Sequence, residues 1–464
     1  MEDLRGLLER LERAGRLRRI TVPVDPRFEL AGVCTRAHRD PVLRQQVLLF
    51  EQVRGHALPV VANLCDTREK VAFALETDSR GLLARGVQAL ERPIPPVVVD
   101  SGPCQEVVME PPDLRRLPLC TNSELDGGPY ITAGLHITAN PVTGVRNVGV
   151  QRNQYHEPDL LGIWMAPTHM FQHYLLAEAA GRPLPVAIAV GVHPALLVAS
   201  QMRLAFDEDE MAAAGGLLGA PVPLVRCRTV PLEVPAHAEV VIEGEVLPHV
   251  RRREGPFGEF ARLYGAARDL PVVRVTAITH RRGALWHNLI AATIPENAVI
   301  GAAGREPALF KAVRSAVPTV TAVHMPTSSG ANFHAIIALQ KRTEGEPQKA
   351  AFAAFAHQDL IKHVFVVDDD IDIYDPADVD YALATRFRAD RDLYVIPRVR
   401  GNPLDPAAEE YAAGRATVTK MIVDATKPLD APPERYRFAE VPRDVMAQIE
   451  RDWARYVGPA GSGQ

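Results

Sequence analysis

The feature that most limits the possible folds is the hydrophobic period, which changes twice along the chain. Up to about residue 105, helix-like segments, such as one over about 2–15, alternate with short strand-like runs. From 106 to 298 most of the pattern is that of strands, and the helix and strand alternation then resumes. We therefore expect an α/β (α+β) multidomain protein: an N-terminal α/β domain over 1–105, a strand-rich domain over 106–298 and a C-terminal α/β domain over 299–464.

Two local signals support this division. The proline-rich run ERPIPPVVVDSGP ends near residue 105, where fixed φ angles and missing N–H donors discourage regular structure. In the strand-rich part, ITAGLHITA and VRNVGVQRNQ flank the turn NPVTG, which predicts a hairpin. Together with later strands, this hairpin predicts an antiparallel sheet or a partly open barrel. The last residues, GPAGSGQ, are typical of a frayed tail.

Composition argues against several classes of protein. The net charge of -5 includes no long block of one sign, so we expect no nucleic-acid partner. The five cysteines form no C-x-x-C pair, which favours a reducing cytoplasm over a disulfide framework. The longest apolar run, LPVAIAVGVHPALLVASQM, is broken by Gly191 and by His193-Pro194, so it predicts a buried strand, a turn and a buried helix instead of a membrane span. We expect a cytoplasmic protein without a membrane partner.

Two polar motifs have both a functional and a plain interpretation. His169 and His173 stand at i, i+4 in APTHMFQHY, the spacing of paired metal ligands on a helix, although histidines at this spacing are more often core residues. The acids of VVDDDIDIYD could bind a hard cation. Alternatively, they end a strand whose Ile371 and Ile373 face the core.

The strand segment NVGVQR carries Asn147 and Arg152, whose odd spacing points them to opposite faces of a straight strand. They can serve one site if the strand bulges, for example at Gly149, or ends there. Otherwise the segment is a polar edge strand with a solvated arginine.

The segment REGPFGEF, residues 253–260, is harder to explain without a function. Gly255, Pro256 and Gly258 exclude a helix, so Glu254 and Glu259 are not an exposed helical face. On a rigid loop near arginine, one carboxylate can stay ionised by pairing while the other is kept protonated by burial and like charge. One acid would then orient a partner, and the other would donate a proton.

In the order NVGVQR, THMFQH, AEVVIEGEV and REGPFGEF, followed by DDDIDIYD and TRFRADRD, the chain resembles the UbiD family of reversible (de)carboxylases over nearly its whole length. The resemblance implies a central flavin-reductase-like split β-barrel between two α/β domains, with the last helix taking part in a homodimer. It also implies prenylated FMN, supplied by a flavin prenyltransferase and bound through a manganese ion, and commonly potassium.

The resemblance also assigns site residues. Arg152 would pair with the substrate carboxylate, Glu254 would hold Arg152, and Glu259, free of a direct partner, would protonate the product carbon. The manganese ligands would be Asn147, His169 and Glu239, which leaves His173 without that role. Further flavin neighbours would be Val150, Gln151, Thr168 and Met202, and potassium would lie near Ala199, Ser200, Met202, Glu239 and the backbone of Val148, where the family often has an aromatic residue.

The implied reaction is non-oxidative decarboxylation of an aromatic or heteroaromatic, α,β-unsaturated acid with release of CO2. The segment AATIPENAVIGAAGRE would complete the substrate pocket together with Arg152. In it, Asn297 stands where relatives that bind dicarboxylates often carry His, which favours a heteroaromatic or hydroxylated aromatic monocarboxylate, such as a pyrrole- or indole-type acid. The plain alternative is that Asn297 caps a helix.

Three other functions stay open from the sequence. One is a decarboxylase of cinnamate-type or alkenoic acids. Another is a split-barrel flavin oxidoreductase, although the chain has no G-x-G-x-x-G loop. A third is a non-catalytic subunit of a carboxylase, against which Arg152, Glu254 and Glu259 are all present.

Overall fold

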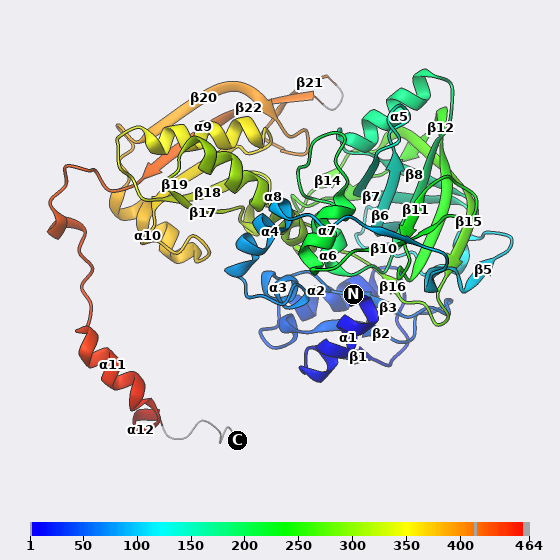
Figure 1. Cartoon of the computed structure of the whole chain (residues 1–464), viewed down its shortest axis with the longest axis horizontal. Helices are drawn as coiled ribbons and strands as arrows, with labels where there is room; N and C mark the ends of the chain where they lie inside the picture. Colours follow the sequence, from blue (N-terminus) through cyan, green and yellow to red (C-terminus); the bar gives the residue numbers. More distant parts are fainter. Residues whose placement is uncertain (1, 413–414, 458–464) are drawn as a thin grey trace.

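The computed structural model describes residues 2–412 and 415–457 (Figure 1); the predicted tail over 458–464 lies outside the described residues. The N-terminal region begins with α1, whose buried Leu4, Leu7 and Leu11 repeat at helical spacing and whose first turn is capped by the Asp3 carboxylate. Its sheet has the order β1-β2-β3-β16, so a segment far along the chain completes it. The elements are α1 (Leu4–Arg13), β1 (Leu17–Ile20), α2 (Glu29–His38), β2 (Val47–Phe50), β3 (Val60–Ala62), α3 (Arg68–Ala74), α4 (Gly81–Glu91) and β16 (Trp286–His287).

The central region is a closed barrel of antiparallel strands in the order β12-β9-β6-β7-β8-β15, with β15 pairing back onto β12. The predicted hairpin is confirmed as β6 and β7. The expected partly open barrel closes because β12 and β15 are long enough to pair along almost their whole length, with bulges that let them curve. The barrel strands are β6 (Tyr130–Ala139), β7 (Arg146–Glu157), β8 (Leu160–Trp164), β9 (Leu184–Val190), β12 (Val240–Glu254) and β15 (Arg268–His280).

Short elements surround the barrel. β5 (Val107–Met109) extends its sheet beyond β15, and β4 (Val97–Val99), β10 (Pro223–Arg226) and β11 (Glu233–Pro235) form a separate three-stranded sheet. The hairpin of β13 (Phe257–Gly258) and β14 (Tyr264–Gly265) follows β12. Helices α5 (His169–Ala179), α6 (Pro194–Ala199) and α7 (Glu210–Leu218) complete the region.

The C-terminal region is a mixed sheet in the order β17-β18-β19-β22-β20, with β21 paired to β22. Figure 1 shows α11 and α12 at the end of an extended segment that leads away from the rest of the chain. The elements are α8 (Glu296–Ala316), β17 (Val320–His324), β18 (His334–Leu339), α9 (Glu346–His357), β19 (His363–Asp368), α10 (Pro376–Arg386), β20 (Leu393–Gly401), β21 (Glu409–Ala412), β22 (Arg415–Ala425), α11 (Arg443–Arg451) and α12 (Trp453–Val457).

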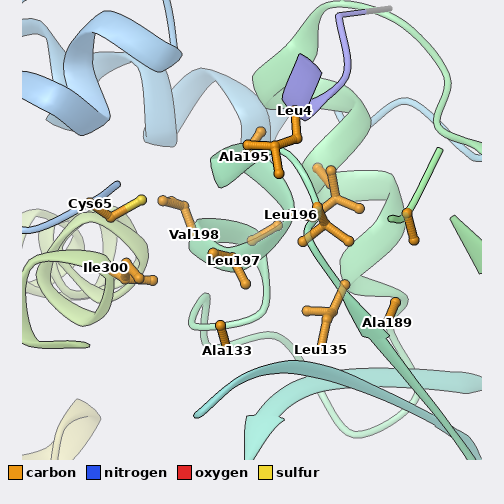
Figure 2. Packing of buried hydrophobic residues seen from close by; sticks show 14 of the residues in the cluster. Leu4, Cys65, Ala133, Leu135, Ala189, Ala195, Leu196, Leu197, Val198 and Ile300 are labelled. Atoms are coloured by element: carbon orange, nitrogen blue, oxygen red, sulfur yellow. The ribbon is translucent and has the colours of Figure 1, made fainter. Parts of the chain in front are cut away.

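Helix α6 joins the three regions. The long apolar run forms β9, a turn at Gly191 (φ 73°) and α6, whose six residues are all buried, as its pattern predicts. Figure 2 shows the apolar side chains of α6 among Leu4 of α1, Ile300 of α8 and Leu135 of the barrel. The residues at the end of α6 are therefore fixed by contacts with all three regions. Within the described ranges, none of the helices combines the length and apolar character needed to cross a membrane.

Candidate active site

Arg152 lies on β7 and binds both predicted carboxylates. Its Nε and Nη2 donate to the two carboxylate oxygens of Glu254 at 2.9 and 3.0 Å, and its Nη1 donates to Glu259. All three side chains are at least nine-tenths buried. A two-point pair at one acid and a single contact at the other mean that Glu254 fixes the guanidinium more firmly than Glu259 does. The prediction that Glu259 has no direct partner is wrong, because the hairpin brings it back to Arg152.

The hairpin geometry explains this meeting. Glu254 ends β12, and Gly255 then turns the chain with φ of 90°, a conformation that favours glycine. Gly258 is paired with Tyr264, and the Glu259 N–H donates to the Leu263 carbonyl at 2.9 Å, which closes the turn. Because successive side chains alternate, Phe257 and Glu259 face Arg152 while Gly258 faces away.

Asp126 anchors the same hairpin from the opposite face. Its carboxylate accepts from the backbone N–H of Gly258 at 2.9 Å and of Ser123 at 2.8 Å. Burial raises the pKa of Asp126. On this outer face a cavity of about 680 Å³ separates the hairpin from α2, and Arg39 and Arg262 line it. Neither Arg152 nor Glu259 lines this cavity, so it is distinct from the carboxylate cluster.

A second cluster forms around Asn147. The Asn147 side-chain amide and the Val148 backbone N–H each donate to Glu210 at 2.8 Å. Glu210 is the first residue of α7, is 4% exposed, and has no Lys or Arg partner in the described ranges. Burial raises the pKa of the Glu210 carboxyl to about 8. A buried carboxylate beside an amide oxygen, without a cation of its own, suits a hard metal ion.

Glu239 is not part of this cluster, and its prediction as a ligand for manganese and potassium must be corrected. Its fully buried carboxylate receives two hydrogen bonds from Arg5 at 2.8 Å and one from Arg281 at 3.3 Å. It also accepts from the Leu285 N–H. These groups neutralise and fill the carboxylate, so Glu239 ties α1 to the barrel and has no free oxygen lone pairs directed at a metal.

Glu210 is the residue that the sequence reasoning missed. It ends the acidic run Asp207 to Glu210, which as a sequence pattern indicates only the start of a helix. In the structure Asp209 is the N-cap of that helix and accepts from the Met211 N–H. Which of four neighbouring acids becomes buried depends on how α7 packs against α6 and β7.

The two histidines of α5 differ in burial, and His173 is the core residue that the plain interpretation predicts. His173 is fully buried, its Nδ1 lies 3.1 Å from the Thr138 hydroxyl, and burial lowers its pKa to about 4. His169 is half-buried at the first turn of α5, and Phe206 lies edge-on to both rings. Since Phe206 leads into Glu210, His169 is placed beside the segment that carries the buried carboxylate.

The other predicted flavin and potassium residues lie around these clusters. Val150 and Gln151 stand between Asn147 and Arg152 on β7, and the Gln151 side chain accepts from the Ala166 N–H. Thr168 is the N-cap of α5 and makes no side-chain capping bond. Ala199 is the last residue of α6, Ser200 is its C-cap and Met202 follows; α6 packs on α7. A bulge at Gly149, one of the ways in which Asn147 and Arg152 could share a site, is not found: the register between β6 and β7 shifts instead on β6, between Ile131 and Gly134.

Asn297 lies in the first turn of α8, where Pro295 is the N-cap, so the capping alternative is not supported. In the part of the chain that the structure describes, its side chain has no hydrogen-bond partner. Thr293 instead bonds to Thr35 of α2 at 2.7 Å. Asn297 is thus a free amide near the start of α8, inside the segment predicted to line the pocket.

The acidic run after β19 has the plainer of its two roles. Arg386 donates to Asp368 and Asp370, while Ile371 and Ile373 are buried. Throughout residues 2–412 and 415–457, three or more Cys, His, Asp or Glu side chains nowhere meet in a geometry that could hold a metal ion. The Asn147 cluster differs from such a group because one of its members is an amide.

Known proteins resemble this chain over most of its length. Models of the N-terminal, Rift-related and C-terminal domains of 3-octaprenyl-4-hydroxybenzoate carboxy-lyase (UbiD) match residues 8–90, 97–294 and 298–425. The chain is 36% identical over 406 residues to an anhydromevalonate phosphate decarboxylase of Methanothermobacter thermautotrophicus, covering 88% of this chain and 93% of that one.

Solved structures give the same result. The UbiD-class enzyme HmfF of Pelotomaculum thermopropionicum in complex with FMN matches with a TM-score of 0.89 at 43% identity, over 96% of this chain and 100% of that one. An evolved dimeric form of HmfF in complex with prFMN matches at 0.85 and 41%, over 95% and 97%. A 3,4-dihydroxybenzoic acid decarboxylase of Enterobacter cloacae matches at 0.86 and 32%, over 97% and 99%.

Proposed function

Since the chain belongs to the UbiD family and is a carboxy-lyase of that family, we propose that it reversibly decarboxylates an aromatic or heteroaromatic acid at Arg152, with prenylated FMN as cofactor. The observation that carries the proposal is the buried cluster in which one arginine holds Glu254 at two points and Glu259 at one. A carboxylate substrate can replace the weaker partner without disturbing the stronger one.

The residues then divide the work. Glu254 keeps the guanidinium in place, and Arg152 binds the substrate carboxylate, which fixes the bond to be broken. Glu259, displaced from its cation and still buried, takes up a proton. When the C–C bond breaks and CO2 leaves, that proton passes from Glu259 to the carbon that carried the carboxylate. The bound cofactor supplies the electron sink that this bond cleavage needs.

The residues present fit a flavin phosphate joined to a metal ion. Asn147, His169 and Glu210 offer one imidazole and two hard oxygen groups, a set that suits manganese. The first turn of α5 has free N–H groups, and its N-cap Thr168 makes no side-chain capping bond to them, which favours a phosphate. Further flavin neighbours would be Val150, Gln151, Thr168 and Met202, and potassium would take Ala199, Ser200, Met202, Glu210 and the carbonyl of Val148.

For the substrate, the free amide of Asn297 supports a ring N–H or hydroxyl partner. A purely aliphatic acid would leave this amide unpaired in the closed pocket at a cost of about 1–3 kcal/mol. We therefore favour a pyrrole- or indole-type or hydroxylated aromatic monocarboxylate. The relative named anhydromevalonate phosphate decarboxylase favours a second candidate, a phosphorylated acid of that type.

The test is a substrate panel with protein co-produced with a flavin prenyltransferase. It contains pyrrole-, indole-, furan-, hydroxybenzoate- and cinnamate-type acids and anhydromevalonate phosphate, assayed for CO2 release and for deuterium exchange of the products in D2O. We expect the heteroaromatic acids to react fastest and Asn297→Ala to change the ranking. Reaction of anhydromevalonate phosphate alone would select the second candidate, and an unreactive panel would contradict the assigned reaction class.

A further inference from the structure

Two aromatic rings contact the Arg152 guanidinium in addition to its carboxylates. The Phe257 ring centroid lies 4.7 Å from the Arg152 Cζ, and the Trp164 ring lies 5.1 Å from it. Both distances are in the range of cation–π attraction. The backbone places both rings: Trp164 is the cross-strand partner of Arg152 on β8, and Phe257 lies in the hairpin between Glu254 and Glu259.

The Phe257 ring is itself held from behind. It is 5% exposed and packs on Tyr130 of β6, with ring centroids 4.6 Å apart and planes tilted by 53°. Tyr130 is fully buried, and its hydroxyl donates to the Gln154 side chain at 3.2 Å. A continuous stack therefore runs from the barrel wall through Tyr130 and Phe257 to the guanidinium of Arg152.

The two rings act in one step of the proposed reaction, the exchange of Glu259 for the substrate carboxylate. While the substrate carboxylate replaces Glu259, the guanidinium loses one of its ion-pair partners and is held by Glu254 on one edge only. A guanidinium with a single two-point partner can still swing about that edge. Rings that attract its faces and exclude water oppose this motion and lower the cost of the exchange.

On the basis of the proposed function, we propose that Phe257 and Trp164 are positioning residues that hold Arg152 ready to accept the substrate carboxylate. They touch neither the carboxylate nor the reacting carbon in this role. Their loss should weaken binding of a carboxylate ligand, raising Kd and KM, while kcat changes less. A ligand with the same ring but an uncharged carboxamide should not depend on them.

The experiment uses the flavin-loaded full chain and four variants: Phe257→Leu, Trp164→Leu, Trp164→Phe and, as a matched control, Phe73→Leu. Phe73 carries a similar contact, with its ring centroid 4.6 Å from the Arg10 Cζ, remote from the site. Calorimetry measures Kd for pyrrole-2-carboxylate and pyrrole-2-carboxamide, and steady-state kinetics give KM and kcat for the best acid of the panel.

We expect the two leucine variants to raise Kd and KM for the acid by roughly ten-fold, with Trp164→Phe closer to the parent. The carboxamide Kd and the Phe73→Leu variant should match the parent. If Phe257→Leu does not fold, the Trp164 pair decides the question.

Active, folded leucine variants with parental Kd and KM for the acid would overturn this inference and leave the decarboxylase function intact. An equal loss of acid and carboxamide binding would also overturn it, since it would indicate a general change of pocket shape. If the parent binds the acid more tightly than Phe257→Leu does but never releases CO2, the positioning role is supported and the proposed reaction is contradicted. A parent that binds none of the acids would overturn both.

Discussion

Arg152 has two carboxylate partners that hold it with different strength. At the scale of single residues, this difference determines which carboxylate a substrate can displace. Glu254 is fully buried and makes two hydrogen bonds, whereas Glu259 makes one and stands on a hairpin turn. The partner that is easier to displace is also the one that the proposal uses as proton donor.

We predict that Glu259→Gln lowers the decarboxylation rate by roughly 10²–10⁴-fold, because glutamine keeps the shape but supplies no acidic proton. Flavin content and fold should be unchanged. The control is Glu124→Gln, an exposed acid at the outer face of the same hairpin, which should retain parental turnover. CO2 release on the best acid measures both, and near-parental turnover by the first variant would end the assignment of the proton donor.

A second residue-scale prediction concerns the metal. Glu210→Gln should lower the stoichiometries of manganese and flavin together, because it removes the charged ligand from the Asn147 cluster. Glu239→Gln should keep both and instead lower the free energy of unfolding by about 2 kcal/mol, since it weakens the contacts with Arg5 and Arg281. Elemental analysis and flavin absorbance are the measurements. Full metal content in the first variant, or its loss in the second, would restore Glu239 as the ligand.

At the scale of elements, α6 contacts all three regions and leads into residues that we propose as neighbours of the cofactor. Its side chains pack on α1, α8 and the barrel in one apolar cluster (Figure 2). A change in its packing should therefore alter both the free energy of unfolding and the position of Met202.

We predict that Leu197→Ala lowers the free energy of unfolding by about 2–5 kcal/mol, because Leu197 is fully buried and its removal leaves a cavity. Val142→Ala, at a side chain that is 77% exposed, should change it by less than about 0.5 kcal/mol. Thermal unfolding of both variants is the comparison, and equal midpoints would contradict the central role of α6. Flavin retention should fall with Leu197→Ala only.

At the scale of the whole molecule, two properties extend beyond the site: acid stability and assembly. Burial lowers the pKa of His136 to about 4 from the ordinary value of 6.5. Below pH 6.5 the unfolded chain takes up this proton, and the folded chain does not until the pH nears 4. Stability therefore falls as the pH drops through this window and is not affected by His136 above it.

We predict a loss of about 3 kcal/mol from His136 between pH 6.5 and 4. His136→Gln should make the unfolding midpoint fall less steeply over this range, whatever its effect at pH 8. Melting curves at half-unit steps of pH give the slope. An unchanged slope would show that His136 does not titrate in this range.

The assembly prediction rests on the C-terminal segment. Helices α11 and α12 lead away from the body (Figure 1) and expose Met446, Trp453 and Tyr456 by 40%, 56% and 60%. Apolar side chains on such a segment are stabilised when a second copy covers them. We expect the full chain to be at least a dimer and a chain ending at residue 440 to form a smaller assembly. Light scattering after size exclusion measures both masses, and equal masses would contradict this role.

Much of the candidate site could be predicted from the sequence because its signals are local. The glycines and proline of residues 253–260 exclude a helix in any fold, and the alternation around NPVTG specifies a hairpin by itself. The break at Gly191 likewise predicted β9 and α6 from nearest neighbours alone. The motif order then identified the family, whose domain models match most of the chain.

Only the tertiary structure decided how distant groups pair. Closure of the barrel depends on β12 meeting β15, and the proposal of Glu210 in place of Glu239 as a metal ligand rests on which carboxylate is already neutralised by arginines that lie 234 and 42 residues away in sequence. The contact of Arg152 with Glu259 is decided in the same way, at a separation of 107 residues. Local sequence fixes backbone conformation and side-chain chemistry, but burial and charge pairing are properties of the whole fold, because they depend on every group that packing brings near.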